Sequence, residues 1–237
     1  MGILGRAQGV LEPIATVFVL LASGLLLWTQ IESRWFKQQP GAPEDVSGLR
    51  IASSQVRHSN GTGPIALVEF TDYECPFCGQ HSRATAPALK RRFVDGGTIT
   101  YIVFNYPLER IHPKARKAAQ AAECAGRQGK YWEMHGYLFN HQDNLTADGL
   151  RAAGASVGLQ MAEFDGCLSG ETDTLVSSDI KEGSRLGVSS TPTFFLGKIQ
   201  SDGSIELVQR FGGSAPLQVF EKLVSELTNH RRRFWLW

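Results

Sequence analysis

The sequence has little net charge, few cysteines, no internal repeat and no low-complexity segment. Its 24 Lys and Arg residues nearly balance its 23 Asp and Glu residues, and the net charge of +1 gives no reason to expect nucleic acid as a partner. An apolar content of 42% and a charged content of 20% are ordinary for folded proteins and argue against disorder throughout. The 237 residues suffice for one sizeable domain, or for a small domain with an insertion.

Only four cysteines are present, and only two of them are closely spaced. Cys75 and Cys78 form a Cys-x-x-Cys motif, whereas Cys124 and Cys167 lie far apart and form no second one. A structural zinc site usually needs a second such pair or a matching pair of histidines. The motif can therefore be interpreted as a redox pair, or as part of a metal site with His81 and a remote fourth ligand.

The longest uncharged stretch runs from Ile14 to Ile31 and predicts a single N-terminal transmembrane helix. Its length of about 27 Å is close to the ~30 Å thickness of the hydrocarbon core of a bilayer. We interpret residues 1–31 as an uncleaved membrane anchor. The alternative is a signal peptide cleaved at Ala22-Ser23-Gly24. Basic residues on the two sides of the stretch nearly balance, so they do not fix its orientation.

Downstream of the anchor, strand patterns flank one long helical region. Residues 32–60 are polar with Pro and Gly, and they predict a linker with a possible edge strand. Residues 61–111 predict a buried strand, a helix and a second strand, which implies a parallel crossover. Residues 112–186 show only helical periodicity, and residues 187–229 predict a strand hairpin followed by a helix. The fold class is α/β with an inserted all-helical domain, followed by a basic and aromatic tail over residues 230–237.

The Cys-x-x-Cys pair directly follows the predicted buried strand and opens the helix. A thiol at a helix N-terminus lies against unsatisfied backbone N–H groups and the positive end of the helix dipole, which favours the thiolate. This context favours a redox pair over a metal half-site. In the second half of the chain, Thr191-Pro192 directly precedes a strand, where a proline is a candidate cis residue. An ordinary trans proline at a strand start is the alternative.

Three segments together resemble the DsbA-like thiol:disulfide oxidoreductases, which are thioredoxin-fold proteins of the bacterial cell envelope with an inserted helical domain. The segments are EFTDYECPFC, AAECAGRQGKYWEMHGYLF and GVSSTPTFFLG, and the resemblance covers roughly residues 60 to 228. It implies an enzyme that needs no cofactor beyond a Cys75–Cys78 disulfide. It also implies two kinds of partner, exported proteins with cysteines and a membrane protein that recycles the pair. The implied location is the extracytoplasmic side of a bacterial cell membrane, reached through the anchor at residues 14–31.

The resemblance assigns catalytic roles residue by residue. Cys75 matches an exposed nucleophilic cysteine, Cys78 its buried resolving partner, and Pro192 a cis-proline packed against the pair. Glu69, six residues before Cys75, matches a buried acidic residue beneath the active site. A carboxyl group buried there would have a raised pKa and could exchange a proton with Cys78. A glutamate on an edge strand that points to solvent is the alternative.

The same resemblance places substrate-binding residues around the pair. Thr191 offers backbone hydrogen bonds to a bound peptide, and Pro76 and Phe77 are the motif residues beside it. Oxidants of the family often carry His between the cysteines, where this chain has Phe77, and the carboxylate of Glu74 would raise the pKa of Cys75 if it lay close. We expect oxidation of substrate thiols. The alternatives are reduction or isomerisation by the same pair, a metal-binding or metal-delivery module, and a redox-inert binding domain.

Cys124 and Cys167 lie on apolar faces of predicted helices in the insertion, and similar positions in some family members form a second, structural disulfide. Closing a loop of this length stabilises a protein by about 3–4 kcal/mol in the loop-entropy model. Two buried free thiols are the alternative. The tail over residues 230–237 either lies on anionic lipid or forms a frayed terminus.

Overall fold

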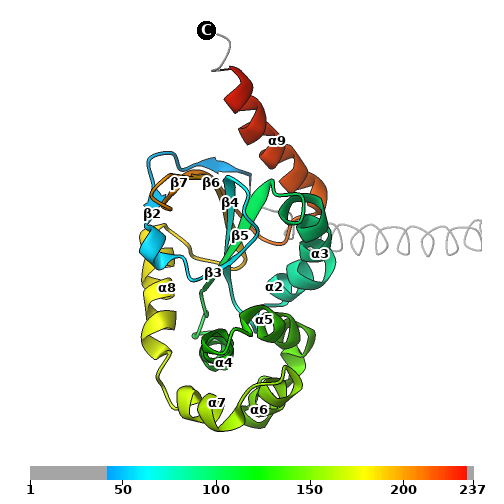
Figure 1. Cartoon of the computed structure of the whole chain (residues 1–237), viewed down its shortest axis with the longest axis vertical. Helices are drawn as coiled ribbons and strands as arrows, with labels where there is room; N and C mark the ends of the chain where they lie inside the picture. Colours follow the sequence, from blue (N-terminus) through cyan, green and yellow to red (C-terminus); the bar gives the residue numbers. More distant parts are fainter. Residues whose placement is uncertain (1–41, 234–237) are drawn as a thin grey trace, which may run out of the picture. The chain divides into compact units, whose positions relative to one another are not determined.

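The structure, a computed structural model, describes residues 42–233. These residues form a seven-stranded mixed sheet with helices on both faces (Figure 1). The long strands are β4 (Ile65–Thr71), β5 (Ile99–Asn105), β6 (Thr193–Ile199) and β7 (Ile205–Gly212). The short strands are β1 (Glu44–Asp45), β2 (Arg50–Ile51) and β3 (His58–Asn60). The strand order is β1-β7-β6-β4-β5-β3, and β2 also pairs with β7.

Strand β4 lies in the middle of the sheet, parallel to β5 and antiparallel to β6. It is buried along its whole length, as expected for an almost continuous apolar run covered on both faces. Alternate side chains of a strand point to opposite faces, so Val68 and Phe70 pack in one apolar cluster while Ile65 and Leu67 pack in the other. Glu69 therefore shares the face of Leu67, whose cluster also contains Cys78.

The cysteine motif opens a helical segment that runs from Pro76 to Val94 and connects β4 to β5. Its parts are α2 (Pro76–Gln80), the π-helical η2 (His81–Thr85), α3 (Ala86–Leu89) and the π-helical η3 (Lys90–Val94). Pro87 has no N–H group and cannot continue the helical hydrogen-bond ladder, which accounts for part of the irregular winding. The predicted strand–helix–strand unit with a parallel crossover is confirmed.

The insertion between β5 and β6 consists of helices packed around α4. They are α4 (Ala115–Arg127), α5 (Tyr131–Asn140), α6 (Ala147–Ser156), α7 (Met161–Leu168) and α8 (Asp173–Arg185). Figure 1 shows α4 to α7 gathered beyond one end of the sheet, with α8 returning along one face of it. The predicted stripe of small residues on α4 is buried, including Ala118, Ala119 and Ala122. After the β6–β7 hairpin, the last helix α9 (Leu217–Arg233) packs against α3.

A buried polar network fastens the insertion to the C-terminal end of β5. Asp179 of α8 accepts hydrogen bonds from the backbone N–H of Asn105 (3.0 Å) and from the side chain of Arg57. Glu123 of α4 accepts one from the Asn105 amide (2.7 Å), and its other oxygen lies 3.0 Å from His58 Nε2. Burial raises the pKa of Asp179 to about 6. Burial alone would also raise the pKa of Glu123. The hydrogen bonds and charges of His58 and Arg57 outweigh burial, so the pKa of this carboxyl is lowered.

Within the predicted linker of residues 32–60, β2 matches the possible edge strand, whereas β1 and β3 depart from the prediction. Within that range, β1 and β2 pair with β7, and His58–Asn60 forms β3, which pairs with the outer side of β5. Segments this short and polar show no strand periodicity in the sequence. They form strands because their backbone groups pair with those of a neighbouring strand. At the other end, α9 continues to Arg233 and so enters the predicted tail.

The predicted membrane anchor, residues 1–31, lies outside the described residues, as do residues 234–237 of the predicted tail. Across residues 42–233, none of the helices combines the length and the apolar character needed to cross a membrane. The α/β part of the predicted fold class, with its helical insertion, is confirmed by the sheet and by helices α4 to α8.

Candidate active site

Cys75 and Cys78 are free thiols at the start of α2. Cys75 caps the helix with an extended backbone (φ −68°, ψ 122°), and Pro76 occupies the first turn, where a missing N–H costs nothing. The carbonyl of Cys75 accepts the N–H of Gly79 at 3.1 Å, which closes the first helical turn. The sulfur of Cys75 is thereby placed at the positive end of the helix, as the motif predicts.

The two thiols differ in acidity. The pKa of Cys75 is lowered to about 6, first because the Cys78 thiol donates a hydrogen bond to its thiolate and then because backbone N–H groups of Cys78 and Phe77 add to that effect. The pKa of Cys78 is raised well above its usual value because of burial and because the Cys75 thiolate lies close. Near neutral pH the pair therefore carries one thiolate, on Cys75, and one thiol, on Cys78.

Cys75 is less accessible than the resemblance implies. It is 3% exposed, so the expectation of an exposed nucleophile is wrong for this structure. The physical reason is the segment around the cis peptide bond between Thr191 and Pro192, where the carbonyl oxygen of Thr191 lies 3.2 Å from Cys75 Sγ and accepts its hydrogen bond in the thiol form. Pro76 and Phe77, which is 37% exposed, mark the open side of the pair. A substrate thiol must therefore approach over these two residues.

Glu69 lies beneath the pair on β4 and is 1% exposed. Burial raises its pKa to about 7, although the hydroxyl of Tyr101 donates a hydrogen bond to its Oε2. His81 Nε2 lies 3.8 Å from the same oxygen, but burial lowers the pKa of His81 to about 3, so this ring is neutral and does not hold Glu69 ionised. Glu69 can therefore change between acid and carboxylate near neutral pH, as a proton donor to Cys78 must.

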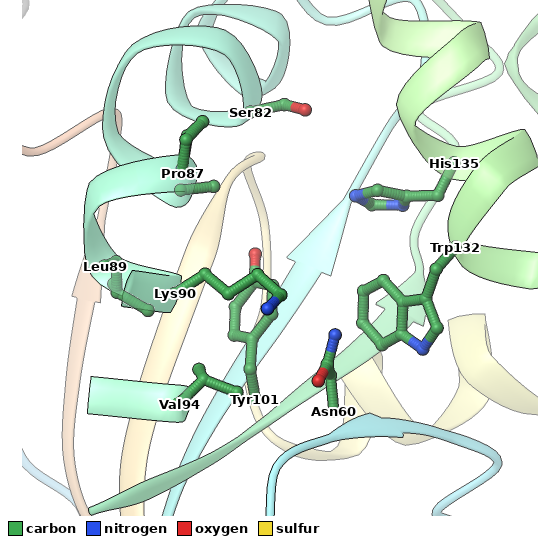
Figure 2. Close-up of a pocket in the computed structure, with 10 residues that line it drawn as sticks. Asn60, Ser82, Pro87, Leu89, Lys90, Val94, Tyr101, Trp132 and His135 are labelled. Carbon is green, nitrogen blue, oxygen red and sulfur yellow. The ribbon is translucent and has the colours of Figure 1, made fainter. Parts of the chain in front are cut away.

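A pocket of about 250 Å³ opens beside Tyr101 (Figure 2). Its walls come from the helical segment on one side, including Lys90, and from α5 on the other, including Trp132 and His135. Tyr101 is 8% exposed, and its hydroxyl reaches Glu69. Tyr101 thus both lines the pocket and binds the buried acid.

Asp72 holds the turn between β4 and α2 in place. It is 1% exposed, its Oδ1 accepts the N–H of Glu74 at 2.8 Å, and its Oδ2 accepts the N–H of Leu108 at 2.7 Å. The carboxylate of Glu74 in turn accepts the backbone N–H of Lys114, at the start of α4. The side chain of Glu74 therefore binds the insertion. The pKa of the neighbouring Cys75 is lowered even though the Glu74 carboxylate is next to it in sequence.

Among these groups, sequence reasoning missed Tyr101 and Asp72. Asp72 carries a local signal, because an Asp side chain that binds the N–H two residues on is a common turn device. His81, considered above as a metal ligand, packs against Phe194 and Phe220 and faces Glu69. Over the part of the chain that the structure describes, no group of three His, Cys, Asp or Glu side chains is arranged to hold a metal ion.

A disulfide joins Cys124 of α4 to Cys167 of α7, with an S–S distance of 2.04 Å. Both residues are buried, and the hydroxyl of Thr172 lies 3.6 Å from Cys124 Sγ. Thr172 directly precedes α8, so the bond lies where three helices of the insertion meet. This pair belongs to the framework of the insertion, whereas Cys75 and Cys78 belong to the sheet and its helix.

Replacing Glu69 by Gln should change how stability depends on pH. The folded-state pKa of about 7 exceeds the ordinary value of 4.5, so between these values the folded protein keeps a proton that the unfolded chain releases. The wild type should therefore lose up to roughly 3 kcal/mol of stability as the pH rises through this window, and Glu69→Gln should not. Urea unfolding of the two reduced proteins at both ends of the window measures the difference. Equal losses would contradict a buried, protonated Glu69.

Comparisons with known proteins show which sequences and structures this chain resembles. A family model described as Thioredoxin matches residues 60–209. A Na(+)/H(+) antiporter NhaA 1 of Mycobacterium sp. is 35% identical over 191 residues, which are 77% of this chain and 30% of that relative. The chain thus spans less than a third of the length of that curated relative. A Rickettsia typhi protein named as a protein-disulfide oxidoreductase is 24% identical over 170 residues, covering 68% of this chain and 62% of that protein.

Solved structures show the same architecture. BdbD from Bacillus subtilis, in its oxidised form, superposes with a TM-score of 0.64 at 21% identity and covers 77% of this chain and 97% of its own. At this level of identity the likeness establishes the fold, including the helical insertion. The family match covers well over half of the chain and includes both cysteines and the cis-proline. The chain therefore belongs to the thioredoxin family, and the Cys75–Cys78 motif lies within the residues that the family model matches.

Proposed function

We propose that this chain exchanges disulfides with cysteines of substrate proteins through Cys75 and Cys78, and that it acts as an oxidant. The observation that carries the proposal is the division of acidity between the two thiols, with a lowered pKa at Cys75 and a raised one at Cys78. A lowered pKa makes Cys75 a good leaving group and stabilises the reduced pair, which favours the oxidation of substrates. The name of the Rickettsia typhi relative supports the same chemistry.

In the oxidising direction, a substrate thiolate attacks Sγ of Cys75 in the Cys75–Cys78 disulfide. A disulfide between the substrate and Cys75 forms, the Cys75–Cys78 bond breaks, and Cys78 leaves and takes up a proton, for which Glu69 is the donor. A second substrate thiolate then attacks the substrate sulfur of the mixed disulfide, and Cys75 leaves as a thiolate. Two electrons pass from the two substrate thiols to the pair, and one substrate disulfide is formed.

The proposed substrate-binding surface consists of the residues that border Cys75. The carbonyl of Thr191 lies against Cys75 Sγ, so a polypeptide whose sulfur binds Cys75 also comes within reach of the Thr191 backbone. Pro192 directly follows Thr191 in this segment, and the exposed rings of Pro76 and Phe77 offer apolar contact on the other side. An extended, unfolded segment around a substrate cysteine fits these features better than a folded surface.

Each oxidising cycle leaves the pair reduced, so a membrane redox partner must take up two electrons and two protons. We place the domain on the extracytoplasmic side of a bacterial cell membrane, anchored through residues 14–31, with exported proteins as substrates. The Cys124–Cys167 disulfide supports this location, because such bonds persist in oxidising compartments. No cofactor beyond the pair is needed for the exchange.

Labelling of an introduced cysteine tests the location. In a Cys75→Ser/Cys78→Ser background, a cysteine placed at the exposed position Ser47 should react with a membrane-impermeant maleimide in intact cells. Protection until the membrane is permeabilised would reverse the proposed orientation.

The reduction potential of the Cys75–Cys78 pair tests the direction of exchange. We expect a value above about −180 mV, well on the oxidising side of the roughly −270 mV of thioredoxin, because the reduced pair is stabilised by the Cys75 thiolate. Equilibration with glutathione redox buffers measures it, and the ultraviolet absorbance of the thiolate should titrate with a pKa of about 6. A potential close to that of thioredoxin, or a Cys75 pKa in the ordinary range, would instead favour a reductase.

A further inference from the structure

The backbone of the cysteine motif is held from the helical insertion by one side chain. Gln142 lies in η4 (Gln142–Asn144), the short turn that follows α5. Its side-chain amide donates hydrogen bonds to two backbone carbonyls, that of Tyr73 at 2.8 Å and that of Cys75 at 2.9 Å. An amide group has two N–H donors, and both of these are directed at the turn that presents Cys75.

The acceptor side of the same amide is also occupied. Arg83, on the helical segment that carries the motif, donates to Gln142 Oε1 at 3.0 Å and to the carbonyl of Phe139 in α5. The Gln142 amide therefore has polar partners at both ends. It lies between the active-site turn and the helix that begins there, although it belongs to neither.

Gly79, the residue directly after the motif, makes room for this arrangement. A Cβ atom at Gly79 would lie 1.9 Å from Gln142 Oε1 and 2.8 Å from Arg83 Nη1. Gly79 is helical and is not one of the glycines with a positive φ, so its backbone conformation does not require glycine. In a helix, alanine would otherwise be the more favourable residue. The close approach of Gln142 explains the glycine.

We propose that Gln142 is a positioning residue for disulfide exchange, which holds the Tyr73–Cys75 turn so that Cys75 Sγ stays aligned with the N–H groups at the start of α2. The inference rests on the function proposed above and names a residue that acts through Cys75. The carbonyl that Gln142 binds is also the one that accepts the N–H of Gly79 and closes the first turn of α2. Holding this oxygen in place therefore holds Cys75, the cap residue, in one orientation relative to the N-terminus of α2 and its dipole.

The contact also gives the insertion a chemical role. Gln142 is 67 positions from Cys75 in sequence and is placed by α5 and η4, so the acidity of Cys75 depends on where the insertion sits.

A double-mutant cycle tests the proposal. Gln142→Ala removes both donors, and Gly79→Ala displaces the amide without removing it. Each variant should raise the pKa of Cys75 by about 0.5–1 unit, because a turn that is no longer held weakens roughly one of the N–H hydrogen bonds to the Cys75 thiolate, and should shift the reduction potential of the pair towards the reducing side. Because both variants break the same contact, the double variant should shift the pKa no further than Gln142→Ala alone.

The pKa is measured from the pH dependence of Cys75 alkylation, which needs no substrate. Gln128→Ala is the matched control, because the Gln128 amide also binds backbone groups, those of Gln160, within the insertion. It should leave the Cys75 pKa unchanged, and thermal unfolding verifies that all variants are folded.

Two results would overturn the role of Gln142, namely an unchanged Cys75 pKa in folded Gln142→Ala and additive shifts in the double variant. A wild type that alkylates with a low pKa but exchanges no disulfide would instead refute the proposed function. The two failures can therefore be told apart.

Discussion

Cys75→Ser should abolish disulfide exchange, and Cys78→Ser should stop it at the mixed disulfide. In Cys75→Ser the only remaining thiol of the pair is that of Cys78, which is fully buried and has a raised pKa, so it can neither be reached nor ionise readily. We expect oxidation of a reduced dithiol peptide to fall on the order of a thousandfold or more. In Cys78→Ser, Cys75 keeps its place at the helix N-terminus, and its thiolate can still attack a disulfide of the substrate, forming a mixed disulfide while the other substrate sulfur leaves as a thiolate.

Mass spectrometry under non-reducing conditions separates these outcomes. Incubation with a peptide that carries an activated disulfide should give a peptide adduct on Cys75 in Cys78→Ser, which persists because no second thiol releases it. The Cys75→Ser protein should give no adduct under the same conditions. Undiminished peptide oxidation by Cys75→Ser would refute the proposed function, and an adduct on Cys78 would reverse the roles of the two cysteines.

Removal of the Cys124–Cys167 disulfide should lower the free energy of unfolding by about 3–4 kcal/mol. The bond spans 43 residues of sequence, and it restricts the unfolded chain over most of α4 to α7. In the folded state it joins α4, which carries Glu123 of the buried network, to α7. Urea unfolding of Cys124→Ala/Cys167→Ala, compared with the parent protein, measures the loss.

The matched control uses the redox state of the same bond. In a Cys75→Ser/Cys78→Ser background, the Cys124–Cys167 pair is the one disulfide left to reduce, since the chain has four cysteines. Adding a reductant should lower the stability of this background protein to nearly that of the protein that also lacks Cys124 and Cys167. A background protein that unfolds at the same urea concentration with and without reductant would show that the bond contributes little.

Features of this protein that depend on nearby residues could be predicted from the sequence. The apolar run of β4 predicts a buried central strand, and alternation along it places Glu69 on the face beneath the cysteine motif. The position of Cys75 at a helix N-terminus follows from its place between a strand pattern and a helix pattern. The five helices of the insertion follow from their periodicity in the same way.

Features that depend on distant residues could not be predicted. Tyr101 binds Glu69 across 32 positions and Gln142 binds the Cys75 carbonyl across 67, and neither has a residue type or spacing that marks it. The cover over Cys75 has the same origin, because Thr191 lies 116 positions away in sequence. Strand β3 was missed because its three residues form a strand only through pairing with β5.

The turn between β4 and α2 has a consequence for how this chain can vary in length. Connections between elements usually tolerate insertions and deletions, because their backbone faces water. Here Asp72 is buried with its carboxylate bound to the backbone N–H groups of Glu74 and Leu108, and Glu69 lies six positions before Cys75. One added residue would leave the strand and the helix intact while moving the acid away from the thiol pair. Natural length variation should therefore collect in other connections, such as the β6–β7 hairpin, and spare this turn.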